Sequence, residues 1–136
     1  ASYVWPVYGQ IEKPYAMTEL VYDRTMADWR VHRGWDIACA AGEPVLAVSG
    51  GTVTAVYEDD LLGTVVEIDH GNDVVSVYAN LDVSPAVGVG QTVSCGDTVG
   101  AVGTTALAES GEEAHLHFAM RRGGSTVDPA EYVPET

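Results

Sequence analysis

The chain has 136 residues, of which 46% are apolar and 19% charged, a composition typical of one globular domain rather than a disordered segment. Only 6 Lys and Arg stand against 20 Asp and Glu, so the formal net charge is −14. That charge argues against binding to a nucleic-acid backbone and against electrostatic adhesion to an anionic membrane. No apolar run approaches the ~20 residues that span a bilayer.

The first thirty residues differ from the rest because aromatic residues alternate with prolines. They include Tyr3, Trp5, Tyr8, Tyr15 and Tyr22, with Pro6 and Pro14 between them. We interpret residues 1–30 as an extended segment that wraps the domain formed by residues 31–136. We expect a helical turn near Thr25–Trp29, and we expect the aromatic side chains to pack on the β core.

From residue 44 onward, short runs rich in Val and Thr are separated by Gly, Asp and Asn, the residues that favour turns. The candidate strands are Pro44–Ser49, Thr52–Glu58, Thr64–Asp69, Val74–Asn80, Gln91–Ser94, Thr98–Val102 and His115–Met120. No window of twelve residues carries a helical stripe of apolar residues. The pattern therefore predicts an all-β sandwich or barrel, closed by a short turn or helix after Val127.

The two cysteines, Cys39 and Cys95, are too few to define a disulfide framework, although sequence alone does not exclude that they pair. A core of this size does not need a covalent staple, so we expect free thiols. Neither cysteine belongs to a CxxC pair, which argues against a cysteine zinc site.

Three of the four histidines occur in two short segments, His32-Arg33-Gly34-Trp35-Asp36 and Ala114-His115-Leu116-His117-Phe118. Alternate residues of a strand point to the same face, so His115 and His117 should project together while Leu116 and Phe118 face the core. The fourth histidine, His70, ends a predicted strand, and we assign it a structural or cleft-lining role rather than a ligand role.

His32, Asp36 and His117 supply two imidazoles and one carboxylate, a ligand set that suits a catalytic zinc with a fourth position for water. Residues i and i+4 of a straight strand lie ~13 Å apart, so the chain between His32 and Asp36 must bend, and Gly34 gives it the freedom to do so. His115 would then lie beside the metal, as a general base or a stabiliser of developing charge. Ordinary hydrogen-bonded histidines are the alternative interpretation.

The ordered motifs resemble those of the M23 zinc metallopeptidases, the lysostaphin-like or LytM domains. The family pattern H-x-G-x-D, Y-x-H-L and H-x-H corresponds to His32 to Asp36, Tyr78-Ala79-Asn80-Leu81 and His115 to His117. The similarity covers roughly Val31 to Tyr132. It implies a two-layered antiparallel β fold with a groove that holds one Zn²⁺ on His32, Asp36 and His117. Family members cleave short peptide links of bacterial cell-wall peptidoglycan.

The chain departs from the family at Asn80, which replaces the histidine of Y-x-H-L. The resemblance implies that this position and His115 assist catalysis. Asparagine can donate a hydrogen bond to an oxyanion, but it cannot carry a proton or a positive charge. Loss of one well-placed donor costs on the order of 10²–10³ in rate, so catalysis is expected to be weakened while zinc binding survives.

Several flanking stretches resemble the stage II sporulation protein Q branch of this family. They include Trp5-Pro6-Val7, the stretch from Leu20 to Trp29, and Asp59-Asp60-Leu61-Leu62-Gly63. Members of that branch are membrane-anchored, and their ectodomain pairs with a partner ectodomain across the forespore intermembrane space. The resemblance thus implies an extracytoplasmic domain whose membrane segment is absent from this chain.

Two functions remain open on these observations. The complete ligand set with His115 favours a zinc endopeptidase that acts on peptidoglycan peptides. Asn80 and the sporulation-like flanks favour a catalytically inactive zinc-binding scaffold that pairs with a partner ectodomain. A lipoyl or biotinyl carrier domain would need a modifiable lysine at a hairpin tip, and the only lysine, Lys13, lies outside the predicted strands.

Overall fold

The computed structural model describes residues 3–13, 16–23, 28–32, 34–59, 62–103 and 114–133, and between residues 12 and 33 it describes the backbone alone. The strands are β1 (Gln10–Lys13), β2 (Ala16–Asp23), β3 (Asp28–His32), β4 (Trp35–Ala38), β5 (Pro44–Leu46), β6 (Gly51–Asp59), β7 (Gly63–Gly71), β8 (Val74–Leu81), β9 (Thr92–Val93), β10 (Thr98–Ala101), β11 (His115–Arg122) and β12 (Ser125–Val127). A 3₁₀ turn, η2 (Pro129–Glu131), follows the last strand.

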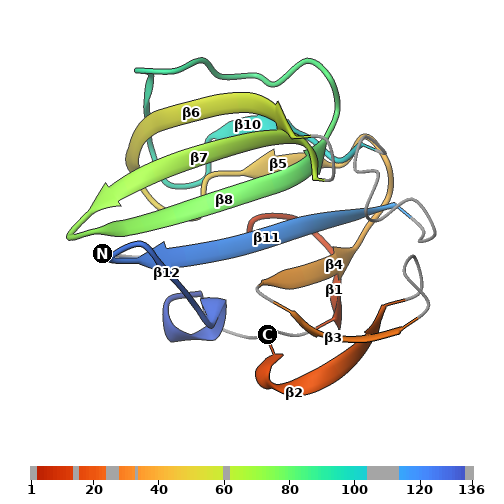
Figure 1. The fold of residues 1–136 in the computed structure, drawn as a ribbon. Coiled ribbons are helices and arrows are strands. Elements are labelled where there is room, and N and C mark those ends of the chain that lie inside the picture. The colour runs from red at the N-terminus through yellow and green to blue at the C-terminus, as the bar shows by residue number, and fades with distance from the viewer. Residues whose placement is uncertain are drawn as a thin grey trace.

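The strands form one large antiparallel sheet and two small ones (Figure 1). The large sheet has the order β1-β4-β11-β8-β7-β6-β9, and β12 pairs with β11. The strands β5 and β10 pair with each other, as do β2 and β3. Every described pairing is antiparallel, so the predicted all-β antiparallel fold is confirmed.

The main core lies on the inner face of the large sheet, where β5 and β10 contribute Val45 and Val99. Leu116, Phe118 and Met120 of β11 are fully buried in this core, as the alternation of that strand predicts. Trp35 and Tyr78 pack on either side of Phe118, with ring centroids 6.1 and 5.4 Å from it. These aromatic contacts join β4, β11 and β8, the strands that carry every predicted site residue except His32 of β3.

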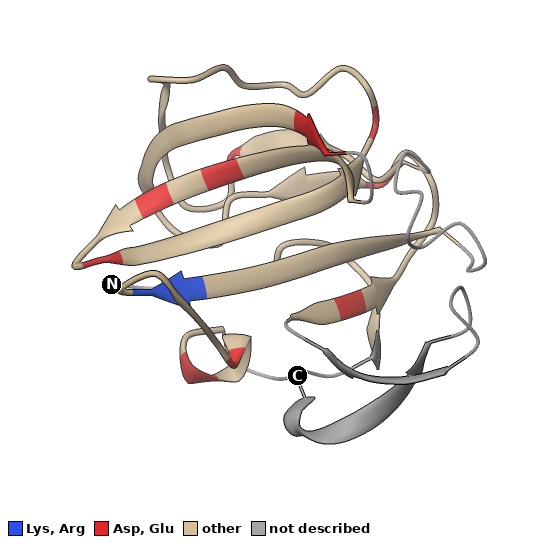
Figure 2. Cartoon of the chain, in the orientation of Figure 1, with Lys and Arg blue, Asp and Glu red and all other residues tan. Residues whose placement is uncertain are grey.

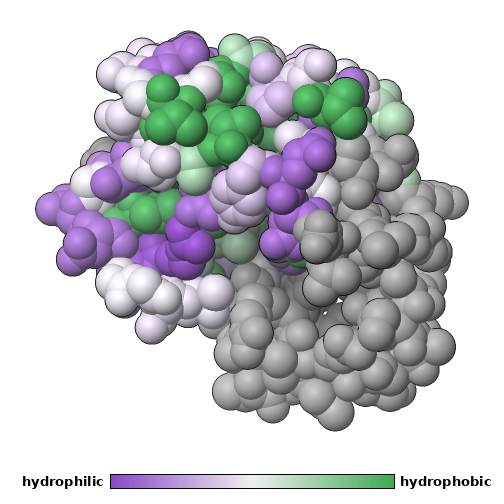
Figure 3. Space-filling view, turned by 45° about the horizontal axis from the view of Figure 1, so that its top comes forward, coloured by the Kyte–Doolittle hydropathy of each residue, from purple (hydrophilic) through white to green (hydrophobic). Residues whose placement is uncertain are grey.

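The opposite face of the sheet carries a second, smaller apolar cluster. Its buried members are Val65, Val77, Ala79 and Ala119, from β7, β8 and β11, with Leu62 and Val75 packed against them. On the described part of the molecular surface seen in Figure 3, apolar residues lie in small patches among polar ones. These short side chains are almost completely buried: Val65 and Ala79 are inaccessible, and Val77 and Ala119 are at most 9% exposed.

The candidate strands from residue 44 onward coincide with β5 to β11 to within a few residues, and η2 is the predicted closing turn. The N-terminal segment contributes β1 to the large sheet, beside β4. Trp5 stacks on Trp35 at 5.3 Å and Tyr3 packs against the core, as expected, whereas Tyr8 is 88% exposed. The predicted helical turn near Thr25–Trp29 is wrong where it can be compared, because β3 begins at Asp28 and pairs there with β2; residues 25–27 lie outside the described ranges.

The remaining expectations on chain organisation have different outcomes. Cys39 and Cys95, both described, are thiols and do not form a disulfide, as expected. Within the described ranges there is no helix long and apolar enough to cross a membrane. The division of the chain at residue 30 stays a prediction.

Gly34, directly before β4, lies against the backbone of β11. A Cβ atom at this position would stand 2.4 Å from the carbonyl oxygen of Phe118, which belongs to the backbone and cannot rotate away. We expect Gly34→Ala to lower the free energy of unfolding by about 2 kcal/mol, because the two strands must separate to admit the methyl group. Urea denaturation measures this loss.

Gly88→Ala is the matched control, because nothing lies within 4 Å of a Cβ atom built on Gly88. Its free energy of unfolding should stay within about 0.5 kcal/mol of the wild type, as for most surface substitutions. Equal stability of the two variants would contradict the proposed close approach of β4 and β11.

Candidate metal centre

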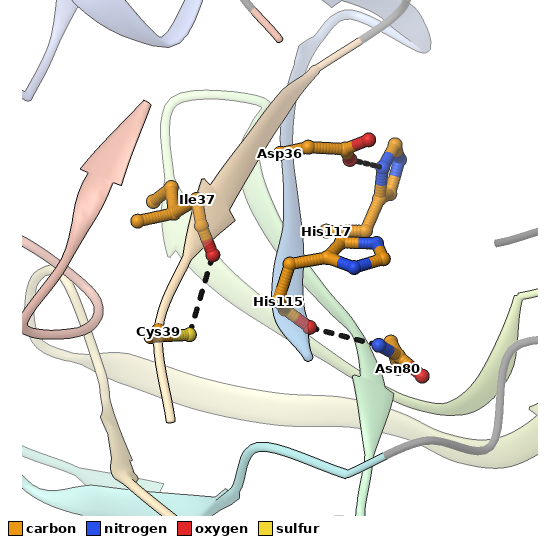
Figure 4. Close-up of polar contacts among 6 residues, drawn as sticks. All are labelled: Asp36, Ile37, Cys39, Asn80, His115 and His117. Carbon is orange, nitrogen blue, oxygen red and sulfur yellow. Dashed lines mark hydrogen bonds and ion pairs between the residues drawn. The ribbon is translucent and has the colours of Figure 1, made fainter. Parts of the chain in front are cut away.

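The site begins with the pairing of β4 and β11, which sets Asp36 directly opposite His117. The Nδ1–H of His117 donates to Oδ1 of Asp36 across 2.8 Å (Figure 4). Asp36 is fully buried, whereas His117 keeps 13% of its side chain exposed. A buried carboxylate next to an imidazole is therefore held at the outer face of the sheet, where solvent reaches the imidazole.

The chain enters this site through a break between two sheets. β3 ends at His32 in the small β2–β3 sheet, and β4 begins at Trp35 in the large sheet. The chain therefore bends at Gly34, as predicted. As a result, His32 belongs to the small sheet and Asp36 to the large one. The side chain of His32 lies outside the described residues, so its part in the site stays a prediction.

His115 lies at the start of β11, opposite Ala38 of β4. It is 1% exposed, and its ring projects to the same side of the strand as that of His117 (Figure 4). The expected common direction of the two imidazoles is therefore correct. The ordinary alternation of a strand produces this arrangement, with Leu116 between them turned into the core.

Asn80 is buried at the point where β8 leaves β11. The last described pair of that ladder is His117 with Ala79, and Asn80 then adopts a left-handed conformation with φ of 62°. Its Nδ2 donates to the backbone oxygen of His115 across 2.8 Å (Figure 4). The side chain thus continues the contact between β8 and β11 beyond the last backbone pair, and asparagine tolerates the left-handed backbone better than most residues.

Among the side chains that the structure describes, no group of three or more His, Cys, Asp and Glu could hold a metal. Asp36 and His117 nevertheless offer one oxygen and one nitrogen donor within 2.8 Å of each other. Two ligands of one Zn²⁺ lie roughly 3–3.5 Å apart, so the donor types fit two of its positions once the Nδ1 proton is lost and the two atoms move slightly apart. The third predicted ligand, His32, is the one whose side chain is not described.

Sequence reasoning missed two polar clusters, because neither forms a local motif. One joins His70 to the core: Nδ1–H donates to Gly50 O across 2.8 Å, and Nε2 lies 2.7 Å from Ser76 Oγ. Ser76 Oγ lies 2.8 Å from Tyr78 OH, which accepts from Val48 N–H. These bonds agree with the structural role expected for His70, and burial lowers the pKa of its imidazole.

The other cluster lies on the outer face of the sheet. Glu67 of β7 accepts hydrogen bonds from Arg121 of β11 and, across 2.6 Å, from Tyr57 of β6. Burial and the Glu67 carboxylate raise the pKa of Tyr57 to about 12, so Tyr57 stays a donor at neutral pH. Only the folded register brings these three residues together.

Comparison with known protein families agrees with the motifs, the antiparallel sheet and the Asp36–His117 pair. The family model described as peptidase family M23 matches residues 30–129. The chain belongs to peptidase family M23. This membership confirms the resemblance on which the zinc-site expectation rests.

Individual relatives of this M23 domain differ in what their names state. A lipoprotein NlpD/LppB homolog from Pseudomonas aeruginosa is 34% identical over 98% of the chain, which spans 40% of that relative. A crystal structure of a zinc containing peptidase from Vibrio cholerae has a TM-score of 0.75 and 26% identity, over 94% of this chain and 39% of that one. The SpoIIIAH–SpoIIQ complex structure includes a match with a TM-score of 0.70 and 25% identity, over 92% of this chain and 90% of that one.

The lowered pKa of His70 predicts how stability depends on pH. The unfolded chain takes up a proton at this imidazole near pH 6.5, whereas the folded protein resists protonation until lower pH. The stability contributed by neutral His70 is therefore full above pH 6.5 and decreases as the pH falls toward the folded pKa. Thermal unfolding between pH 7.5 and 5.5 should show a smaller loss of stability in His70→Gln than in the wild type.

Every other histidine is present in both proteins, so the comparison isolates His70. Glutamine can still donate to Gly50 O and accept from Ser76, which limits the loss of structure in the variant. Parallel pH profiles of the two proteins would show that the imidazole of His70 titrates alike in the folded and unfolded chains.

Proposed function

We propose that this M23 domain is a zinc metalloendopeptidase that cleaves peptide links of bacterial cell-wall peptidoglycan. The observation that carries the proposal is the Asp36–His117 contact of 2.8 Å, which joins two of the three residues that the family resemblance implies as metal ligands. His115 lies two residues from His117 on the same face of β11. A metal ligand and a candidate proton carrier therefore share one rigid strand.

In this proposal Zn²⁺ is held by His32, Asp36 and His117. When bound, it supplies Lewis-acid polarisation of a peptide carbonyl and lowers the pKa of a bound water. Burial of Asp36 suits this role, because a buried carboxylate is stabilised by a cation and carries a net cost without one. The pairing of β4 with β11 fixes both side chains, so the site needs little rearrangement to take the metal.

His115 is the proposed proton carrier, since imidazole is the side chain whose ordinary pKa lies closest to neutrality. Asn80 occupies the position of the second family histidine and cannot carry a proton. Its described hydrogen bond goes to the backbone oxygen of His115, so we assign Asn80 chiefly to positioning His115. Catalysis is accordingly expected to be slower than with a second histidine.

The second candidate function is a scaffold that binds zinc without useful catalysis and pairs with a partner ectodomain. The replacement at Asn80 and the match to the SpoIIIAH–SpoIIQ structure support it. An extracytoplasmic location suits both candidates, and the similarity to a lipoprotein supports it. The net charge of −14 favours a protein partner slightly, because cell walls carry anionic polymers that repel an acidic protein.

Release of muropeptides from purified peptidoglycan tests the enzymatic proposal. We expect release by zinc-loaded protein to be lost after chelation and in Asp36→Asn, and to fall at least about 100-fold in His115→Ala. Asp69→Asn is the matched control, since Asp69 is an exposed residue bonded to the Gly71 amide. The zinc content of each variant is measured in parallel by competition with a chromophoric chelator.

Two results would contradict this assignment. Zinc-loaded protein that releases nothing from several wall types would exclude the enzyme and favour the scaffold. Release that persists in Asp36→Asn and after chelation would exclude a metal mechanism. Stable capture of a partner ectodomain from the same organism would then test the scaffold.

Asn80→His tests whether this position limits the rate. Restoring an imidazole that can stabilise charge should raise hydrolysis at least about tenfold. Asn72→His is the control, because Asn72 also has a left-handed backbone, with φ of 54°, but is exposed in the β7–β8 turn. An unchanged rate in Asn80→His would mean that another feature of the site limits turnover.

A further inference from the structure

The sheet face that carries Asp36 and His117 continues along β11 to Arg121. Residues 117, 119 and 121 alternate on this face and lie opposite Ala79, Val77 and Val75 of β8, respectively. Ala119, Val77 and Ala79 are short apolar residues of the outer cluster. Ala119 and Val77 keep 9% and 8% of their surface exposed and Ala79 keeps none, and no large side chain of β8 or β11 stands between the proposed metal site and Arg121 along this strand pair.

Arg121 is held in a defined orientation by Glu67. Its Nη2 donates to Glu67 Oε1, and the other carboxylate oxygen of Glu67 accepts from Tyr57 across 2.6 Å. Because Glu67 pairs with Val77 on β8, which in turn pairs with Ala119, the guanidinium must reach across β8 to meet it. Both oxygens of Glu67 are thus engaged, and three strands fix the position of the cation.

Arg121 still has capacity to bind another anion. A guanidinium carries five N–H donors, and the described acceptors use only Nη2. The side chain is 36% exposed. Arg121 and Arg122 are the only Lys or Arg whose side chains the structure describes (Figure 2), and Arg122 donates instead to Tyr132 OH beside η2.

We infer that Arg121 is a subsite for a carboxylate of the bound peptide. Four residues of β11 separate His117 from Arg121, which corresponds to about 13 Å along a strand. An extended peptide laid over the outer face along β11 would span this distance with about four residues, so a carboxylate at one end would meet Arg121 while the other end reaches the metal site. This inference rests on the proposed function, since it names the chemistry of that substrate.

The local charges set the size of the expected effect. Glu67 already neutralises part of the charge of Arg121, and Asp69 lies on the same face of β7, two residues from Glu67. The Asp69 carboxylate accepts from the Gly71 amide within its own turn. A partly exposed arginine with such neighbours should favour a carboxylate over a neutral group by about tenfold in Kd, rather than by several orders of magnitude.

The test compares N-acetyl-tetraalanine, which ends in a free carboxylate, with its C-terminal amide. Binding to zinc-loaded His115→Ala protein, in which turnover is suppressed, is measured by titration of backbone amide NMR signals. We expect the acid to bind about tenfold more tightly than the amide, and this preference to disappear in Arg121→Gln. Arg122→Gln is the matched control, and it should keep the preference.

Each outcome decides the inference. Equal binding of acid and amide, tighter binding of the amide, no binding of either, or equal effects of Arg121→Gln and Arg122→Gln would overturn the carboxylate subsite. Hydrolysis of peptidoglycan by the wild type is scored separately. An acid preference without hydrolysis would reject the proposed enzyme and keep the subsite as a peptide-binding feature, whereas hydrolysis without an acid preference would reject the subsite alone.

Discussion

The candidate site depends on the close pairing of β4 with β11. This contact places Asp36 opposite His117 and allows a 2.8 Å bond between a buried carboxylate and a largely buried imidazole. Gly34 permits it, since any larger residue would meet the backbone of β11. The aromatic contact of Trp35 with Phe118 joins the same two strands from the core side, and Trp5 stacks on Trp35. Packing of the inner face thus supports the geometry of the outer face.

The two faces of the central sheet carry different chemistry. The inner face is a continuous apolar core that determines stability, and its polar exceptions, such as Ser76, are hydrogen-bonded. The outer face combines a small apolar cluster with two polar groups, the Asp36–His117 pair and the Arg121–Glu67–Tyr57 cluster. Because strand residues alternate, β11 supplies one face with Leu116, Phe118 and Met120 and the other with His117, Ala119 and Arg121. The single strand β11 therefore supplies both buried core residues, which stabilise the fold, and the residues of the proposed site.

Much of this arrangement could be predicted from the sequence because it follows from local periodicity. The alternation around His115 and His117 predicted both the strand and the direction of its imidazoles, and the Val-rich runs predicted β5 to β10. The β2–β3 pairing was missed, because aromatic and proline residues near it give no clear alternation. The contacts of Glu67 with Arg121 and of Asn80 with His115 could not be predicted, since they join strands 54 and 35 residues apart and depend on register.

Asn80 links the question of mechanism to the structure. A residue that only replaced a lost catalytic group could be exposed and unconstrained, but Asn80 is buried and bonded to the strand that carries His115. Removing the Asn80 Nδ2 donor would break its hydrogen bond to the backbone oxygen of His115 and lower the free energy of unfolding by about 1–3 kcal/mol. The hydrogen bond from Asn80 therefore stabilises β11 whether or not the protein is an enzyme. The same contact suits an enzyme, in which it orients His115, and a scaffold, in which it keeps the sheet intact; only turnover separates these two roles.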